Sequence, residues 1–349
     1  MTKRLNTLGG ICVLTAAVIL ILDASTAAIG VKEGIDLCIN AVIPALFPFL
    51  FLSGMLNRIV TGHSIGLLRP IGQLCRIPSG AEGIFLTGLI SGYPVGATMV
   101  VNAFQNGSLS KTDARRMLGF CNQTGPAFLF GMLGPVIKNH ALLWAIWGLQ
   151  ILSAAFTGIL LPGTATKVCR YEEAPPITKT DSMKRAIHTM AMICGWVILF
   201  RVLLVFAKQL FLECLSPEIQ ILLTGCLELS NGCTSLSTLE SGGLAMVFSG
   251  LFLSFGGVCV GMQTISVCGS LGTGMYFPGK LLQCSINCVL STIASTLIFP
   301  RDIEPTQLYL LILTVFTMIS TLIYLHRKKV VAFLCRILYN NGSYYYERG

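Results

Sequence analysis

One acidic residue lies within an otherwise apolar stretch, where its chemistry would be unusual. Glu228 falls inside residues 219–239, three positions before Asn231. Side chains at this spacing face the same side of a helix, so these two should lie together. A carboxylate in hydrocarbon is costly and therefore indicates function, here the coupling of a proton or cation or the holding of a cationic partner. The alternatives are a structural ion pair with Arg201 and a helix end near water.

A second polar group lies where glycine and proline interrupt apolar sequence. Asn122, Gln123 and Thr124 directly precede Gly125-Pro126. Amide side chains both donate and accept hydrogen bonds, which suits a neutral or anionic ligand with several polar atoms. A single residue of this kind commonly forms a hydrogen bond between helices, and only the clustering of several at the helix breaks favours a solute-binding site. The predicted solute-binding residues are Ser91, Tyr93, Asn122, Gln123, Thr124, Asn231, Ser254, Gln263 and Asn287, with Glu228 for coupling; Gln283 could complete the lining.

The sequence gives little support for catalysis or cofactor chemistry. Its four His share no metal-ligand spacing with Cys, Asp or Glu, and its fourteen Cys form no C-x-x-C pair. Cys inside apolar stretches behaves as a small hydrophobe. The chain has no phosphate-binding loop and no assembled Ser-His-acid set. We therefore predict that the protein is not an enzyme and has no catalytic residue, cofactor or metal site.

Composition places the chain in a membrane. Of its 349 residues 54% are hydrophobic and 11% are charged, whereas soluble domains carry about 25% charged residues. So few charges cannot cover a water-exposed surface, so most of the surface should face lipid. The net charge of +9 resides between apolar runs and at the two ends. That placement indicates membrane topology and not nucleic-acid binding. We expect a multi-pass cell-membrane protein with the lipid bilayer as its partner.

Apolar stretches of about 20 residues predict the spanning helices. The uninterrupted ones are Leu8–Ile29, Leu37–Leu56, Ala141–Leu161, Ala186–Leu210, Ile219–Leu239, Leu281–Phe299 and Leu308–Leu325. Three others, Gly83–Phe104, Gly119–Ile137 and Leu244–Cys268, contain Gly, Pro and polar residues. Backbone groups freed by such breaks cost several kcal/mol in hydrocarbon, so breaks are expected where they line a polar cavity.

Basic residues then predict the topology. Both termini and the basic connections should be cytoplasmic by the positive-inside rule. Both termini and all the basic connections can lie on the cytoplasmic side only if Gly83–Phe104 and Leu244–Cys268 enter the membrane and return to the same side. We predict an all-α, polytopic membrane protein with about eight spanning helices plus two re-entrant hairpins and an internal two-fold repeat. The two halves would run parallel; inverted halves would require one of these crossings to be different.

Several motifs resemble one family. Ser91-Gly92-Tyr93-Pro94-Val95-Gly96, followed by Asn122-Gln123-Thr124-Gly125-Pro126, resembles the YlbJ family of sporulation integral membrane proteins. The stretches 227–232 and 253–257 are similar to second-half motifs of that family, and the resemblance runs from about Pro44 to Phe299. This family belongs to the nucleoside-recognition, or Gate, group, related to concentrative nucleoside transporters and to the membrane part of ferrous-iron transporters.

The resemblance implies a transporter or permease of a small polar or anionic solute in sporulation, with dipicolinate-type cargo and the outer forespore membrane as its location. The corresponding domains are a first membrane repeat at 1–162 with a Gate-like core at 44–162, a cytoplasmic linker at 163–185, a second Gate-like repeat at 186–326 and a basic cytoplasmic tail at 327–349. Two alternatives stay open: a non-transporting scaffold for spore cortex or coat assembly, and a nucleoside-type permease outside sporulation. Nothing in the sequence fixes the solute, the coupling ion or the oligomeric state.

Overall fold

The protein is a bundle of helices. A computed structural model describes residues 2–60, 66–163, 178–302 and 305–346, and within these ranges every regular element is helical. Six helical stretches of the described chain are long and apolar enough to cross a membrane: Ala24–Leu52, His140–Leu160, Lys179–Leu210, Gly242–Leu271, Tyr276–Ile298 and Pro305–Arg327. The prediction of an all-α, polytopic membrane protein is confirmed.

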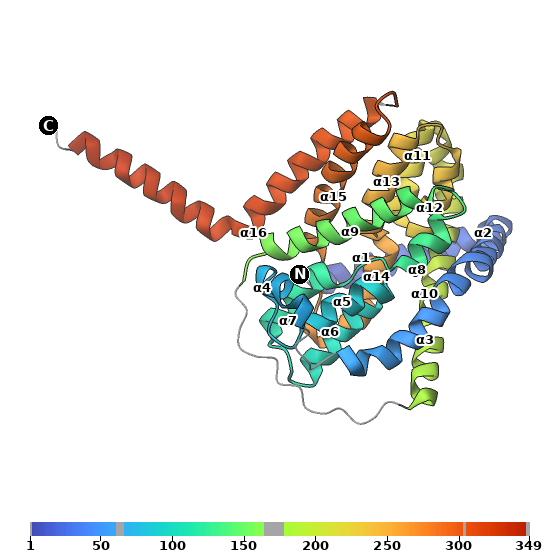
Figure 1. The fold of residues 1–349 in the computed structure, drawn as a ribbon. Coiled ribbons are helices and arrows are strands. Elements are labelled where there is room, and N and C mark those ends of the chain that lie inside the picture. The colour runs from blue at the N-terminus through green and yellow to red at the C-terminus, as the bar shows by residue number, and fades with distance from the viewer. Residues whose placement is uncertain (1, 61–65, 164–177, 303–304, 347–349) are drawn as a thin grey trace.

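The first half of the chain runs from α1 to α9 (Figure 1). Its helices are α1 (Thr2–Leu22), α2 (Ala24–Leu37), α3 (Ile43–Val60), α4 (Arg69–Leu74), α5 (Glu82–Ser91), α6 (Val95–Gln105), α7 (Lys111–Cys121), α8 (Pro126–Phe128) and α9 (His140–Leu160). Helix α7 is capped by Ser110, whose Oγ accepts a hydrogen bond from the Asp113 amide over 3.1 Å. The predicted span Leu8–Ile29 is instead divided at Asp23, whose carboxylate caps α2.

The second half runs from α10 to α16. Its helices are α10 (Lys179–Leu210), α11 (Pro217–Leu227), α12 (Leu229–Ser235), α13 (Gly242–Phe255), α14 (Gly257–Cys268), α15 (Tyr276–Ile298) and α16 (Pro305–Tyr346). Most of the predicted linker 163–185 lies outside the described residues, and its last part already belongs to α10. The predicted tail continues α16, which projects away from the bundle in Figure 1.

Two pairs of short helices fold back on themselves as hairpins. In the first hairpin, α5 and α6, a Cβ added to Gly88 would lie 3.4 Å from the Gly96 Cα, so this predicted hairpin is confirmed. The second hairpin is α11 and α12, in which a Cβ on Gly232 would overlap the Gly225 Cα. The predicted uninterrupted span Ile219–Leu239 is therefore wrong, since the chain reverses at Glu228 between these helices.

The segment Leu244–Cys268 was predicted to fold back as a hairpin, but it does not. As the residue numbers rise along α13 and α14, the numbers of the residues that they contact on α15 fall: Gly243 lies beside Phe299, Gly250 beside Ser291 and Gly261 beside Phe277. Helices α13 and α14 thus continue in one direction across the membrane, and the prediction of a re-entrant hairpin here is wrong. Gly256 and Gly257, with φ of +81° and +75°, break the helix without reversing it. Such φ values favour glycine.

The two halves are inverted, not parallel as predicted. Each half contains a hairpin, a broken helix and a long helix: α5–α6, α7–α8 and α9, then α11–α12, α13–α14 and α15. Helix α7 runs parallel to α15, with Arg115 beside Met275 and Gly119 beside Gly279, whereas α13 runs antiparallel to it. Each hairpin packs its glycines on the broken helix of its own half. The hairpins therefore enter from opposite sides and meet in the middle.

Candidate functional site

A small cavity lies where the two hairpin tips approach each other. Its volume is about 30 Å³, room for roughly two water molecules. Its polar lining comes from Tyr93 in the first tip, Thr124 in the α7–α8 break, Glu228 and Ser230 in the second tip, and Gln263 in α14. Apolar side chains of α10 and of the α2–α3 region cover it, among them Val42, Leu46, Ile193 and Val197.

Glu228 is the acidic residue of this cavity and is buried, with 1% of its surface exposed. It precedes α12 and caps it. One carboxylate oxygen accepts from the Ser230 amide over 3.0 Å, and the other accepts from the Asn231 amide over 2.7 Å and from Asn231 Nδ2 over 2.6 Å. Three N–H donors and the positive end of a helix stabilise a negative charge in an apolar setting. The turn of the second hairpin is thus stabilised by the carboxylate of Glu228, the residue at which the chain reverses.

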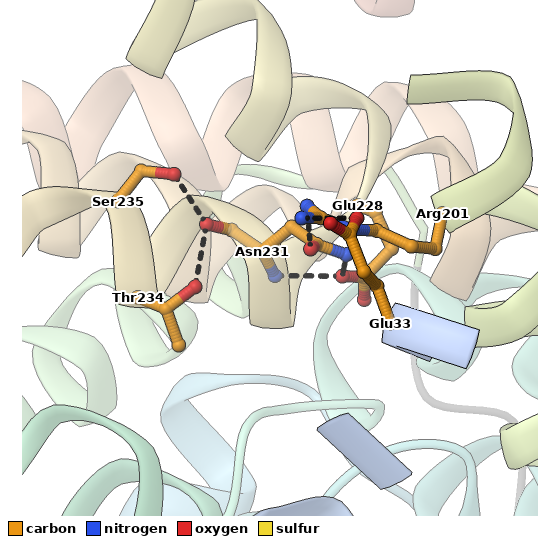
Figure 2. Close-up of polar contacts among 6 residues, drawn as sticks. All are labelled: Glu33, Arg201, Glu228, Asn231, Thr234 and Ser235. Carbon is orange, nitrogen blue, oxygen red and sulfur yellow. Dashed lines mark hydrogen bonds and ion pairs between the residues drawn. The ribbon is translucent and has the colours of Figure 1, made fainter. Parts of the chain in front are cut away.

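A chain of polar contacts leads from Glu228 toward the outside (Figure 2). Asn231 Oδ1 accepts from Arg201 Nη1 over 2.6 Å, and Arg201 pairs with Glu33 of α2 over 2.8 Å. The contact between Glu228 and Arg201 is therefore indirect, with Asn231 placed between them. The outer pair is partly exposed, by 22% for Arg201 and 43% for Glu33.

The first hairpin tip is fastened to the opposite half of the molecule. Tyr93 Oη lies 3.1 Å from the Leu253 carbonyl oxygen, and Thr124 Oγ1 donates to the same oxygen over 2.7 Å. This carbonyl stands where α13 ends, so it lacks a continuing helix to satisfy it. The first tip and the α7–α8 break thus satisfy a backbone group that the α13–α14 break leaves free, which is how irregular backbone is tolerated at membrane depth.

Side-chain amides form a connected network behind the cavity. Gln123 and Gln283 exchange hydrogen bonds of 3.0 and 2.6 Å, and Gln150 of α9 donates to Gln123 Oε1 over 3.0 Å. Gln150 Oε1 in turn accepts from Ser254 over 2.7 Å and from Asn287 over 2.8 Å. All five are buried. A satisfied network of this kind fixes the relative positions of α7, α9, α13 and α15.

Lys280 is the buried cation of the site. None of its surface is exposed, and its Nζ donates to Tyr93 Oη and to Gln283 Oε1, each over 3.0 Å. The ammonium also lies 4.9 Å from the centre of the Tyr93 ring. Within the described residues no carboxylate pairs with it. A lysine buried within a membrane span is uncommon and indicates a functional position.

The predicted residues separate into two sets. Tyr93, Thr124, Glu228 and Gln263 line the cavity, while the remaining ones stand behind it or on the hairpins. That second set comprises Ser91 at the end of α5, Asn122 bonded to Thr264 over 3.1 Å, Gln123, Ser254 and Asn287 in the amide network, and Asn231 beside Glu228.

Two site residues were missed in the sequence. Lys280 reads there as one more basic residue after a turn, and Gln150 is a single amide in an apolar helix. For Gln150 the available signal was its position in the middle of α9, because polar residues inside a span are uncommon; Lys280, four residues into α15, gave no such signal.

Comparison with known proteins gives one relative. Over 294 residues the chain is 27% identical to the sporulation integral membrane protein YlbJ of Bacillus subtilis (strain 168). The aligned region covers 74% of this chain and 69% of that protein. No family model matches the chain, and no solved structure does. The similarity that the Ser-Gly-Tyr-Pro and Asn-Gln-Thr-Gly-Pro motifs indicate thus extends along most of the sequence, and the protein, which is similar to YlbJ, is a multi-pass integral membrane protein.

Proposed function

We propose that this protein is a transporter of a small polar or anionic solute. The observation that carries the proposal is the cavity between two inverted hairpin tips, lined by Tyr93, Thr124 and the buried Glu228. Broken helices and hairpin tips at the interface of inverted repeats are where secondary transporters bind substrate and coupling ions. The cavity's small volume corresponds to a closed state, and a solute would need the tips to separate.

Glu228 is the coupling residue in this proposal. Its carboxylate is the negative group among the cavity-lining residues, so an anionic solute would be repelled unless a proton or cation neutralised it. Co-binding of a proton or a cation with an anion would satisfy both charges. Lys280, acting on the cavity through the Tyr93 hydroxyl, would favour an anion at the opposite wall.

The cellular setting comes from the relative, whose name assigns it to sporulation. We propose the same setting for this chain, with dipicolinate-type cargo as the first solute to test. A nucleoside-type solute is the second, because its sugar hydroxyls and base also match the amide and hydroxyl groups around the tips.

Uptake into proteoliposomes tests the proposal. The purified chain would be reconstituted and offered radiolabelled dipicolinate, uridine and a dicarboxylate of similar size, with and without a proton gradient. We expect one solute to accumulate above empty vesicles, and Glu228→Gln to abolish gradient-driven accumulation. The matched control is Glu213→Gln, an exposed carboxylate outside the site. Absence of uptake for every solute, or full accumulation by Glu228→Gln, would reject the proposal.

A non-transporting scaffold for cortex or coat assembly is the second candidate. The observation that favours it is the completeness of the amide network, in which Gln123, Gln150 and Asn287 are all engaged within the protein. A scaffold predicts that a sporulating host carrying Glu228→Gln forms normal spores. Transport predicts spores as deficient as those of a deletion strain, with the protein present at its normal level.

A further inference from the structure

Two adjoining hollows open on the side of the bundle where α7 and α15 begin and α9 ends. One, of about 420 Å³, lies between the start of α15 and residues 324–327 of α16. The other, of about 330 Å³, lies against the first turns of α7. Both are bordered by Pro162, Gly274 and Met275, so they form one continuous depression. We call these two hollows together the basic trough.

The trough carries positive charge without a matching negative charge. Arg115 borders one hollow, and His326 and Arg327 border the other, while no carboxylate side chain of the described residues borders either. Arg116 also reaches the trough, but it is buried and donates to the carbonyls of Cys75, Arg76, Gly158 and Leu161. Among the described residues neither Arg115 nor Arg327 pairs with a carboxylate, and both side chains are exposed.

The backbone of Arg115 and the guanidinium group of Arg327 are each packed against neighbouring groups. The Arg115 carbonyl accepts from the Met275 amide over 2.9 Å, and a Cβ added to Gly274 would lie 2.6 Å from the Arg115 Cβ. This close approach packs the turn before α15 directly on α7. On the other wall, the Arg327 guanidinium lies 5.2 Å from the centre of the Tyr324 ring. A guanidinium group that is already placed, as that of Arg327 is, loses less conformational entropy when it binds an anion.

The position of the trough matches the headgroup layer of a membrane. The apolar spans end there at Leu160 and Arg327 and begin there at Tyr276. From the trough, exposed apolar side chains of α16 continue into the apolar zone, among them Ile323 and Ile319. Only 11% of the α16 span is buried inside the protein. Basic pockets between membrane helices at this level bind anionic phospholipid headgroups, and Tyr and Arg are typical of the interface.

We propose that the basic trough is a binding site for an anionic phospholipid. Arg115 and Arg327 would donate hydrogen bonds to the phosphodiester oxygens, and the acyl chains would lie along the exposed face of α16. Arginine favours this role because its planar guanidinium matches two phosphate oxygens at once. The lipid would join α16 to α7 and α15 at the end where α16 leaves the bundle.

Native mass spectrometry of the full-length protein tests the site. The protein would be released from detergent after equilibration with phosphatidylglycerol or phosphatidylcholine, and compared with Arg115→Gln/Arg327→Gln. We expect the double variant to lose about tenfold in retention of phosphatidylglycerol, as removal of one or two charge-assisted phosphate contacts implies, with phosphatidylcholine unchanged. Lys208→Gln, an exposed basic residue at the far end of α10, is the matched control and should retain phosphatidylglycerol fully.

Two further arms keep the result decisive. If the double variant does not fold, wild-type protein should still prefer phosphatidylglycerol over phosphatidylcholine and lose that preference at high salt. Inorganic phosphate at millimolar concentration should neither displace phosphatidylglycerol nor raise the melting temperature. Equal retention of both lipids by the wild type, unchanged retention by the double variant, or stabilisation by phosphate equal to that by the lipid would overturn the assignment.

Discussion

The two hairpin tips differ in the length of the turn and in how they are secured: three residues, 92–94, join α5 to α6, and Glu228 alone joins α11 to α12. The first tip is held by the opposite half of the molecule, because Tyr93 contacts the Leu253 carbonyl and receives a hydrogen bond from Lys280. The second tip is held by itself, because Glu228 accepts hydrogen bonds from the next turn of its own hairpin. Its outward connection ends at the partly exposed pair of Arg201 and Glu33.

This difference indicates which hairpin moves more easily. Separation of the first tip from α13 and α15 would leave a buried carbonyl and a buried ammonium without partners, which is costly in an apolar interior. Separation of the second tip would carry Glu228 and its three N–H donors along as a unit. We therefore expect α11–α12 to open on the cavity while α5–α6 stays in place.

The largest expected effect is at the second tip. Glu228→Ala removes the acceptor of three buried N–H groups and the cap of α12, so local stability of the second hairpin should fall by about 3 kcal/mol. Hydrogen exchange of residues 217–235 measures this loss. Glu240→Ala, an exposed carboxylate before α13, serves as the control and should exchange like the wild type. Wild-type exchange in Glu228→Ala would mean that the carboxylate does not hold the tip.

An intermediate effect is expected at the first tip. Tyr93→Phe and Lys280→Met each break the contact between α5–α6 and α15, so their effects should not add. We expect a coupling energy of about 1 kcal/mol, measured by hydrogen exchange of residues 84–100 in the two single variants and the double variant. Additive effects would show that the 3.0 Å contact between these side chains does not stabilise the tip.

The smallest effect is expected at the outer ion pair. Glu33→Gln should destabilise the protein by about 0.5 kcal/mol, because partly exposed pairs contribute little and are screened by salt. Melting temperatures of Glu33→Gln and wild type should therefore converge as sodium chloride is raised. A large loss that persists at high salt would place this pair among the groups that hold the second hairpin and would reduce the contrast between the tips.

The sequence predicted the helical membrane fold and the three breaks that contain Gly or Pro, because hydrophobicity and Gly/Pro content report on them directly, but it did not predict the break at Glu228. It did not predict which broken segment turns back. Gly256-Gly257 interrupts an apolar stretch and Glu228 lies in one without Gly-Pro breaks, yet packing along α15 shows that the helix continues past Gly256-Gly257, and the approach of Gly232 to Gly225 shows that the chain reverses at Glu228. The inverted relation of the halves depends on that single distinction.

The site was predicted in part for a similar reason. Glu228 and the Asn-Gln-Thr run stand out because they are polar residues in apolar or broken sequence. Lys280 does not, because a basic residue four positions into α15 resembles the positive charges that flank spans. Its burial depends on the close approach of α7 to α15, where a Cβ on Gly279 would lie 2.5 Å from the Gly119 Cα.

The central claim, that the solute enters the cavity between the hairpin tips when the second tip moves away, is tested most directly by joining the second tip to the α7–α8 break. Thr124→Cys and Ser230→Cys both replace residues that line the cavity, in a background whose other cysteines are replaced. Oxidation to a disulfide between them, verified by mass spectrometry, should stop dipicolinate accumulation in proteoliposomes, and reduction should restore it. Equal accumulation by the oxidised and the reduced protein would contradict the claim.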